Sequence, residues 1–331
     1  MNRPIVILSS ILAAQIVLGA VLNFGIGHTT QVANGPVLTL PHDKIDGIEI
    51  SSKDQTAKLV LRDGAWHLPD YYDLPASADG VKVLLDHFDK LDNNAPIATT
   101  SDARKRFKVD ASDFERRVVF RQGGKILATV YVGTNGSRNR SMLRVEGNDA
   151  IREEPIANYE LQTDPAQWTD KSILHIPAAS IAGMDVAGLH LTYASSGGAQ
   201  SAPSPASKGA AQWTATGVPA GHTFDPAAAA KLAGMVSNLD FEAVLGTDAK
   251  PEYGLAQPLA DIRVARQGGS QREYRIGKSE KEDWYALQVS DRKEIFKLLP
   301  FEATPLIDAS KLEALTKTEG GTPPAPVAKK K

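Results

Sequence analysis

The chain has 331 residues, of which 42% are hydrophobic and 23% are charged, and its formal net charge is −2. This composition is typical of a folded protein, and the length is sufficient for two domains with their own cores. The near-neutral charge argues against a polyanionic partner for the molecule as a whole. The absence of cysteine excludes disulfides, thiolate catalysis and zinc sites built on thiolates.

The N-terminal segment is the most apolar part of the sequence. The run from Ile5 to Phe24 follows Arg3, and the next charged residue is Asp43. A run of about 20 apolar residues suits a membrane-spanning helix, whereas the apolar region of a cleaved signal peptide is shorter. We therefore expect an uncleaved signal anchor over residues 1–24 and a tether over 25–37. With Arg3 retained inside, the remainder would lie in the periplasm of a bacterium, anchored once in the inner membrane.

Two stretches of the chain contain the same ordered pattern, displaced by about 145 residues. The matching pairs are Trp66 and Trp213, Asp79 and Asp225, and the turns Gly123-Gly124 and Gly268-Gly269. Internal repetition of this kind decides where domains begin and end. We expect a first repeat over residues 38–175 and a second repeat over residues 176–310.

The first repeat begins with short runs of β-forming residues. We expect strands over 48–50, 58–61 and 66–68, the last after an Asp63-Gly64 turn. A helix follows with Asp79 as its N-cap, because Val81, Leu84, Leu85, Phe88 and Leu91 form one apolar stripe.

The rest of the first repeat is typical of a β-meander. Strands are expected over 117–121 and 125–132, joined by a Gly123-Gly124 turn that needs positive φ. The Asn135-Gly136 pair then predicts a hairpin to a strand over 141–145.

The second repeat follows the same plan. Strands are expected near 189–193 and 212–214, and Asp225 with Pro226 opens its helix. Residues 194–211 are rich in Ser, Gly, Ala and Pro, and this position predicts a flexible hairpin loop within the repeat. Residues 311–331 are expected to form a disordered tail. The predicted fold is α+β: two tandem repeats, each a mainly antiparallel sheet with one principal helix, after a transmembrane helix.

No pattern in the sequence indicates catalysis. The seven histidines are scattered singly, and no nucleophile elbow or phosphate-binding loop occurs. The adjacent acids Glu153-Glu154 and Glu282-Asp283 would point to opposite faces of a strand, and we expect them to be solvated. We therefore predict no enzyme activity, no cofactor and no metal site.

One stretch of the first repeat is strongly basic. Between Arg104 and Arg144 there are eleven basic residues and three acids. A candidate patch for an anionic partner consists of Arg104, Lys105, Arg106, Lys108, Arg116, Arg117, Arg121, Arg138, Arg140 and Arg144. The alternative is a solvated set of strand faces balanced by acids elsewhere. Nucleic acid is not expected for a protein outside the cytoplasm, and the basic stretch lacks interleaved stacking aromatic residues beyond Phe107, Phe114 and Phe120.

The two recurring tryptophans, Trp66 and Trp213, are expected to occupy one shared core position in each repeat, where the ring packs the hairpin on the helix. A role in stacking against a ligand is the alternative for both residues.

The sequence resembles bacterial membrane-anchored proteins that carry domain of unknown function 4340, over roughly residues 40–310. The resemblance rests on the Asp63-Gly64-Ala65-Trp66 hairpin, the aspartate-capped helix, and Tyr253-Gly254-Leu255 followed by Pro258. It also rests on the strand that ends at Gly277. The first repeat departs from the pattern with Phe107-Lys108-Val109 where Tyr-Gly-Leu is expected. The resemblance implies an accessory role beside ABC transporters of the gliding-motility type, and it carries over no catalytic residue.

These features favour a non-enzymatic, membrane-anchored binding or scaffold protein whose partner is an ABC transporter permease or another envelope protein. A periplasmic protein that binds a small ligand is the alternative, with a pocket between the repeats lined by Trp66 or Trp213. An envelope hydrolase is the third hypothesis, and it requires convergent acids that the sequence does not display.

Overall fold

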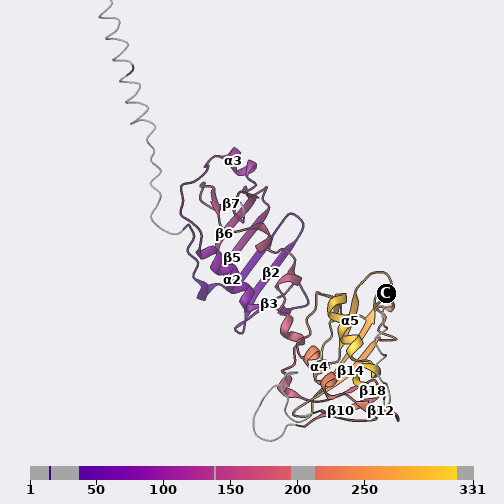
Figure 1. Cartoon of the computed structure of the whole chain (residues 1–331). Helices are drawn as coiled ribbons and strands as arrows, with labels where there is room; N and C mark the ends of the chain where they lie inside the picture. The colour runs from indigo at the N-terminus through magenta and orange to yellow at the C-terminus, as the bar shows by residue number, and fades with distance from the viewer. Residues whose placement is uncertain (1–14, 16–36, 138, 195–212, 319–331) are drawn as a thin grey trace, which may run out of the picture. The chain divides into compact units, whose positions relative to one another are not determined.

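The computed structural model describes residues 15, 37–137, 139–194 and 213–318. The predicted anchor, the tether up to residue 36, nearly all of the predicted loop 194–211 and the chain from residue 319 onward lie outside these described residues. No helix in the described part combines the length and apolarity that crossing a membrane requires. The chain divides into two compact units, 1–58 with 81–163 and 59–80 with 164–331 (Figure 1).

The first sheet has eight strands in the order β4-β3-β2-β1-β5-β6-β7-β8. Its strands are β1 (Gly47–Ser51), β2 (Thr56–Arg62), β3 (Ala65–Leu68), β4 (Leu74–Pro75), β5 (Arg116–Gln122), β6 (Lys125–Asn135), β7 (Ser141–Val145) and β8 (Arg152–Glu154). The associated helices are η1 (His42–Lys44), α2 (Ala78–Asp89), α3 (Ser101–Arg106) and η2 (Asn158–Glu160).

Helix α2 covers one face of the first sheet. The predicted stripe is buried along α2, and the Phe88 ring meets Phe120 of β5 edge-on at 5.0 Å between centroids. On β1, Ile48 and Ile50 are buried on this side, because alternate residues of a strand point to opposite faces. The predicted amphipathic helix is therefore present and packs through the predicted residues.

The second sheet also has eight strands, in the order β11-β10-β9-β14-β15-β16-β17-β13. Its strands are β9 (Ile181–Val186), β10 (Leu189–Tyr193), β11 (Trp213–Thr216), β13 (Ala243–Gly246), β14 (Ala260–Arg266), β15 (Gln271–Lys278), β16 (Tyr285–Val289) and β17 (Ile295–Leu298). A separate pair consists of β12 (His222–Phe224) and β18 (Thr316–Thr318). The helices are η3 (Pro165–Trp168), η4 (Lys171–Leu174), η5 (Ala178–Ser180), α4 (Pro226–Ser237), η6 (Pro251–Tyr253), α5 (Pro300–Ala309) and α6 (Leu312–Leu315).

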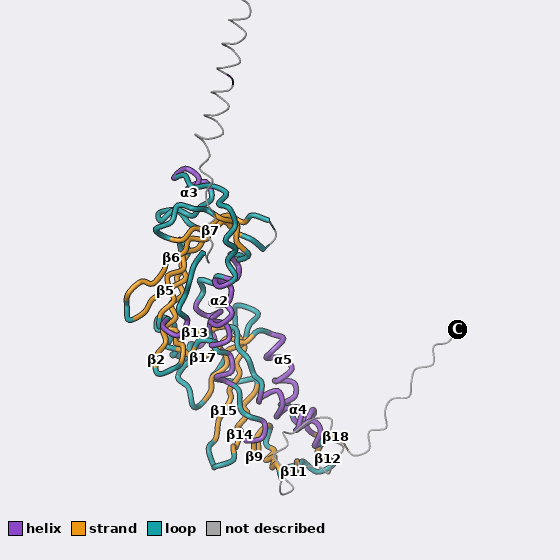
Figure 2. Tube along the Cα trace, turned by 90° about the vertical axis from the view of Figure 1, so that its left-hand side faces the viewer, coloured by secondary structure: helices purple, strands orange, loops and turns teal. Residues whose placement is uncertain are grey.

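Helices α4 and α5 lie along one face of the second sheet (Figure 2). Leu232 of α4 and Leu306 of α5 are buried in the same apolar cluster as Ile262 and Val264 of β14. The large antiparallel sheets with few helices agree with the predicted α+β class.

The chain follows the same path through both sheets. In the first, β1, β2 and β3 are joined by hairpins, α2 follows, and β5 to β8 continue on the other side of β1. In the second, β9, β10 and β11 precede α4, and β14 to β17 continue on the other side of β9. The predicted glycine turns are present, with φ of 54° and 78° at Gly123 and Gly124 and 89° and 83° at Gly268 and Gly269.

Three expectations for the helices and the tail need correction. Helix α2 begins at Ala78, one residue before Asp79, because the Ser77 hydroxyl accepts the Gly80 amide hydrogen at 3.1 Å and acts as the cap. The second sheet has two principal helices, not one. Helix α5 starts at Pro300, where the Glu302 carboxylate accepts the Leu299 amide at 3.0 Å.

The predicted tail does not begin at residue 311. Residues 312–318 form α6 and β18, and Leu315 is fully buried in the core of the second unit. Strand β18 pairs with β12 through Thr316 and Phe224. The few apolar residues after α5 do not predict that β18 pairs with β12. The two strands are about 90 residues apart in the sequence, and hydrophobic periodicity reports only on local structure.

Candidate functional site

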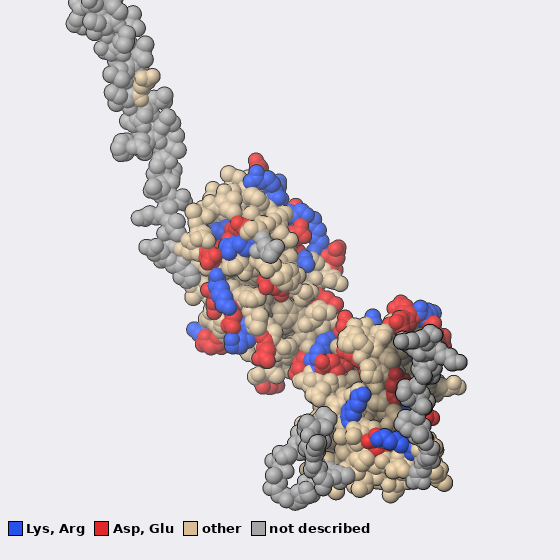
Figure 3. All heavy atoms as spheres, viewed as in Figure 1, with Lys and Arg blue, Asp and Glu red and all other residues tan. Residues whose placement is uncertain are grey.

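Six of the ten predicted basic residues form ion pairs with acids, of which only Glu115 lies within the basic stretch. The ion pairs are Arg104–Asp149 at 2.5 Å, Lys108–Glu115 at 2.7 Å, Arg117–Glu49 at 2.8 Å, Arg140–Asp92 at 3.1 Å, Arg144–Glu146 at 3.2 Å and Arg121–Glu49 at 3.7 Å. On the face shown in Figure 3, basic and acidic side chains are interspersed. Lys105 and Arg106 are exposed on α3, and Arg138 lies outside the described residues. For most of these residues, this arrangement favours solvated strand faces balanced by acids over a basic patch for an anionic partner.

Arg144 does not belong to a surface patch, because it is 3% exposed. Its Nε donates to the carbonyl oxygen of Val109 at 2.8 Å, and its guanidinium lies 4.7 Å from the centre of the Tyr131 ring. Arg144 therefore holds the segment around Val109 against the outer face of the first sheet, the face opposite α2.

Lys108 has an unusual backbone conformation at the point where the chain lies close to Gly133. Its φ is 54°, in the left-handed region that glycine normally occupies. A Cβ on Gly133 would lie 1.9 Å from the Phe107 carbonyl oxygen and 2.7 Å from that of Lys108. The Phe107 carbonyl also accepts the amide hydrogen of Thr134 at 2.9 Å.

The second sheet has a glycine at the corresponding place. There φ is 67° at Gly254, and a Cβ on Gly277 would lie 2.3 Å from the Tyr253 carbonyl oxygen. Phe107-Lys108 and Gly133 therefore repeat the geometry of Tyr253-Gly254 and Gly277, with lysine in place of glycine. A half-exposed ion pair to Glu115 contributes little net stability, so this pair does not explain a lysine at a position that suits glycine.

Lys108 lines a pocket of about 480 Å³ in the first unit. We call it the Lys108 pocket, and its lining consists of Ser52, Lys53, Asp54, Gln55, Lys108, Phe114, Glu115, Arg116 and Thr163. The hydrogen bond from Lys108 to the Glu115 carboxylate raises the pKa of the lysine, which is therefore charged at neutral pH. Lys53 Nζ lies 3.0 Å from the Asp113 carboxylate.

Hydrogen bonds fix the positions of several other side chains that line the Lys108 pocket. The Ser52 hydroxyl accepts the amide hydrogens of Asp54 at 3.3 Å and Gln55 at 3.2 Å, which shapes the turn between β1 and β2. The buried Thr163 hydroxyl donates to the Gln55 side-chain oxygen at 3.3 Å. Arg116 Nε donates to the Leu161 carbonyl at 3.0 Å, so the guanidinium is fixed at the rim.

Two residues of this pocket belong to the set predicted from the sequence. Lys108 and Arg116 belong to the predicted basic set, and the departure from Tyr-Gly-Leu at Lys108 was the signal that could have singled it out. The Ser52–Gln55 turn and Thr163 were missed, because they are distant in sequence and carry no motif.

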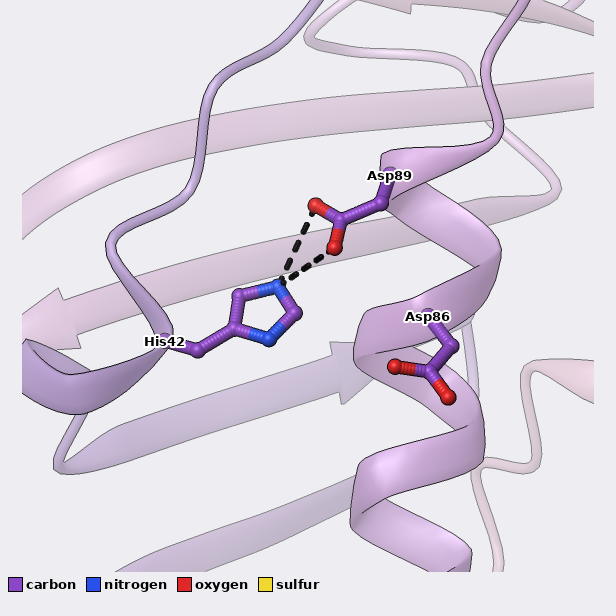
Figure 4. Close-up of side chains that lie close together, drawn as sticks. All are labelled: His42, Asp86 and Asp89. Carbon is purple, nitrogen blue, oxygen red and sulfur yellow. Dashed lines mark hydrogen bonds and ion pairs between the residues drawn. The ribbon is translucent and has the colours of Figure 1, made fainter.

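A second cluster brings together residues from η1 and α2. The ligand-type atoms of His42, Asp86 and Asp89 all lie within 4.8 Å of one another (Figure 4). His42 Nε2 lies 3.1 Å from the Asp89 carboxylate, and Asp86 pairs with Lys82 at 2.7 Å. That hydrogen bond from Lys82 lowers the pKa of Asp86. Both carboxylates are thus engaged by side chains of the protein, as in an ordinary ion-paired surface.

The tryptophans differ from each other in burial. Trp213 is 3% exposed and packs against Tyr193 with ring centroids 5.2 Å apart, as expected for a core residue. Trp66 of β3 pairs with Leu61 of β2 and is only half-buried. Neither residue lines the Lys108 pocket.

Glu154 was expected to be solvated, and this expectation is wrong. It is fully buried on β8, while its neighbour Glu153 faces outward and accepts the Ser137 amide. Oε2 of Glu154 accepts the Asp92 amide hydrogen at 2.6 Å, and burial raises the pKa of Glu154 to about 7. The register Ser141–Glu154 corresponds to Tyr285–Leu298 in the second sheet, so Glu154 occupies the place of a buried leucine.

The outer face of the second sheet, opposite α4 and α5, carries a row of charged residues across four strands. His190 pairs in register with Asp185, Asp185 with Arg263, and Arg263 with Glu273. Asp185 and His190 form an ion pair, and Arg263 Nη2 lies 3.4 Å from the Glu273 carboxylate. We call these four residues the polar row. All four are exposed or half-buried.

The family described as "Domain of unknown function (DUF4340)" matches residues 66–258, more than half of the chain. The chain belongs to this family. The match begins in the hairpin at Trp66 and ends at Pro258, just after the Tyr253-Gly254-Leu255 segment, so it includes elements of both sheets. No curated protein and no solved structure matches the chain.

Proposed function

We propose that this protein is a non-enzymatic, membrane-anchored, extracytoplasmic binding or scaffold protein. Its anchor is the apolar segment 1–24, and its partner is an ABC transporter permease of the gliding-motility type or another envelope protein. Membership of the family and the charge-free length of the N-terminal segment support this assignment. The scaffold acts by contact between surfaces.

The observation that carries the proposal is the polar row on the second sheet. Helices α4 and α5 cover the opposite face, so the strand surface bearing His190, Asp185 and Arg263 faces solvent. Cross-strand pairing orders the charges before any partner arrives, and pre-ordered complementary charges favour specific association. An ordered, polar strand surface of this kind suits the surface of another folded protein.

We also propose that the two sheets are tandem repeats, over residues 38–175 and 176–310. The common chain path supports this organisation, as does the shared close approach at Gly133 and Gly277. The isolated bridge between Ala98 and Ile151 in the first unit further corresponds to the pairing of β13 with β17.

Site-specific photo-crosslinking in native membranes tests the partner. A crosslinking amino acid at His190, in the polar row, is expected to capture a permease subunit. The matched control carries the same amino acid at Lys231, an exposed position on α4. Equal capture from both positions, or none from His190, would count against a partner on the sheet face.

The absence of cysteine allows a direct test of the anchor. A single cysteine at exposed Lys105 is expected to react with a membrane-impermeant maleimide in spheroplasts. A single cysteine at Asn2 is expected to react only after lysis, because the N-terminus would lie in the cytoplasm. Protection of the residue-105 variant in intact spheroplasts would contradict the proposed topology.

A further inference from the structure

We propose that the Lys108 pocket binds the carboxylate group of a small anionic ligand. This inference goes beyond the scaffold function and does not depend on it, since every lining residue belongs to the first unit. The pocket volume of about 480 Å³ is within the range of small-molecule sites.

The cations of the pocket already hold carboxylates of the chain itself. Glu115 lies against Lys108 and Asp113 against Lys53, and all four side chains are at least one-third exposed. Exposed pairs of this kind exchange partners at small net cost. A ligand carboxylate can therefore replace Glu115 on the Lys108 ammonium group, with Arg116 at the rim adding a second positive charge.

The neutral lining residues describe the rest of the ligand, and Asp54 adds one carboxylate to the lining. Ser52, Gln55 and Thr163 provide hydroxyl and amide groups whose positions are fixed by the turn. The Phe114 ring forms an apolar wall. The structure thus suits a compact molecule that carries a carboxylate together with further hydrogen-bonding groups.

The backbone at Lys108 is the second, independent observation. Lys108 is left-handed where the backbone closely approaches Gly133, and the second sheet has Gly254 at the corresponding place. A long cationic side chain at a position that suits glycine is unfavourable for folding but places an ammonium group in the pocket. Strain retained at a pocket residue is a mark of a functional site.

Titration calorimetry on the full chain in mild detergent tests the inference, with succinate as the probe and sodium chloride of equal ionic strength as the reference. Saturable binding of succinate is expected, tighter than that of inorganic phosphate. Lys108→Gly is expected to weaken succinate binding about tenfold or more, because a charge-assisted hydrogen bond is lost. Lys105→Ala removes an equal charge from α3 outside the pocket and should bind as the parent does.

Glu115→Gln adds a change in the opposite direction. It removes the internal competitor of Lys108, so succinate should bind severalfold more tightly than to the parent chain. A purely structural Lys108–Glu115 pair would produce no such gain.

Denaturant unfolding of the variants distinguishes a loss of succinate binding from a loss of folded protein. Lys108→Gly should unfold at the same denaturant concentration as the parent or a higher one, since glycine relieves the left-handed strain. A heat of binding no different from sodium chloride, preference for phosphate over succinate, or unchanged succinate affinity in Lys108→Gly would each overturn the inference. Failure of the crosslinking experiment at His190 would leave these results untouched.

Discussion

The amide of Asp92 donates a hydrogen bond of 2.6 Å to the buried carboxylate of Glu154. This contact ties the segment after α2 to β8, and Arg152 Nε adds a second link by donating to the Asn94 carbonyl at 3.0 Å. The corresponding strands of the second sheet, β13 and β17, are joined by regular backbone pairing. A carboxyl group therefore takes part in a junction that the other sheet builds from main-chain bonds.

The buried Glu154 makes stability depend on pH. Its pKa is raised from 4.5 to about 7 by burial, and the charges of Asp92, Arg140 and Arg152 also act on it. Because the folded state holds this proton more tightly than the unfolded state, the contribution to stability is present below pH 4.5 and is lost as pH rises to about 7. The loss corresponds to about 3 kcal/mol in the free energy of unfolding.

Denaturant unfolding of the parent and Glu154→Gln from pH 4 to 8 measures this effect. The stability difference between them should shift in favour of the glutamine variant as pH rises, because the amide cannot ionise. Glu154→Leu, which introduces the residue of the second sheet, should behave in the same way. A difference that stays constant over this range would show that Glu154 does not titrate as described.

Gly133 should be intolerant of a side chain. Gly133→Ala places a methyl group 1.9 Å from the Phe107 carbonyl oxygen, so backbone must move to relieve the clash. We expect a loss of more than about 2 kcal/mol in the free energy of unfolding. Gly234→Ala is the matched control, since a Cβ there meets nothing within 4 Å inside α4, and it should be neutral or stabilising. Equal effects of both substitutions would contradict the close approach.

Asp225 combines a helix cap with a link to β18. Its carboxylate accepts the amide hydrogens of Ala227 at 3.0 Å and Ala228 at 3.4 Å, and it pairs with Lys317 at 2.7 Å. We expect Asp225→Ala to cost about 1 kcal/mol, mainly through the cap, and Lys317→Ala to cost less. The Lys317 hydrogen bond and the cap lower the pKa of Asp225, so its contribution is present at neutral pH and is lost in acid. Thermal unfolding at pH 7 and pH 3 should show the gap between parent and Asp225→Ala closing in acid.

Arg144 is expected to be a structural residue. Arg144→Lys keeps the charge but loses the bond from Nε to the Val109 carbonyl, which leaves a buried polar group unpaired. We predict a loss of about 1–3 kcal/mol on chemical denaturation. Arg121→Lys, on the half-exposed end of β5, should change stability by less than about 0.5 kcal/mol. A larger effect at Arg121 than at Arg144 would assign the stabilising role to the surface pairs instead.

The elements that local signals specify could be predicted from the sequence. The Gly123-Gly124 turn, the apolar stripe of α2 and the Asp225 cap were all foreseen, because turn chemistry, helical periodicity and capping depend on residues a few positions apart. The α+β class followed from these local elements. The start of α2 was misplaced: the hydroxyl of Ser77, two residues before Asp79, accepts the Gly80 amide hydrogen and caps the helix.

Features built from distant residues were decided by the tertiary structure. Four residues of the basic set pair with Glu49, Asp92 or Asp149, which lie outside the basic stretch and meet it only through sheet pairing and loop packing. Glu154 looked like a surface acid, because a strand pattern gives no sign of which face a neighbouring segment will cover. The Lys108 pocket likewise needed Thr163 and the Ser52–Gln55 turn to be brought beside Lys108. Helical periodicity and turn residues specify local structure through residues a few positions apart. Burial and charge pairing depend instead on which strands become neighbours in the folded sheet.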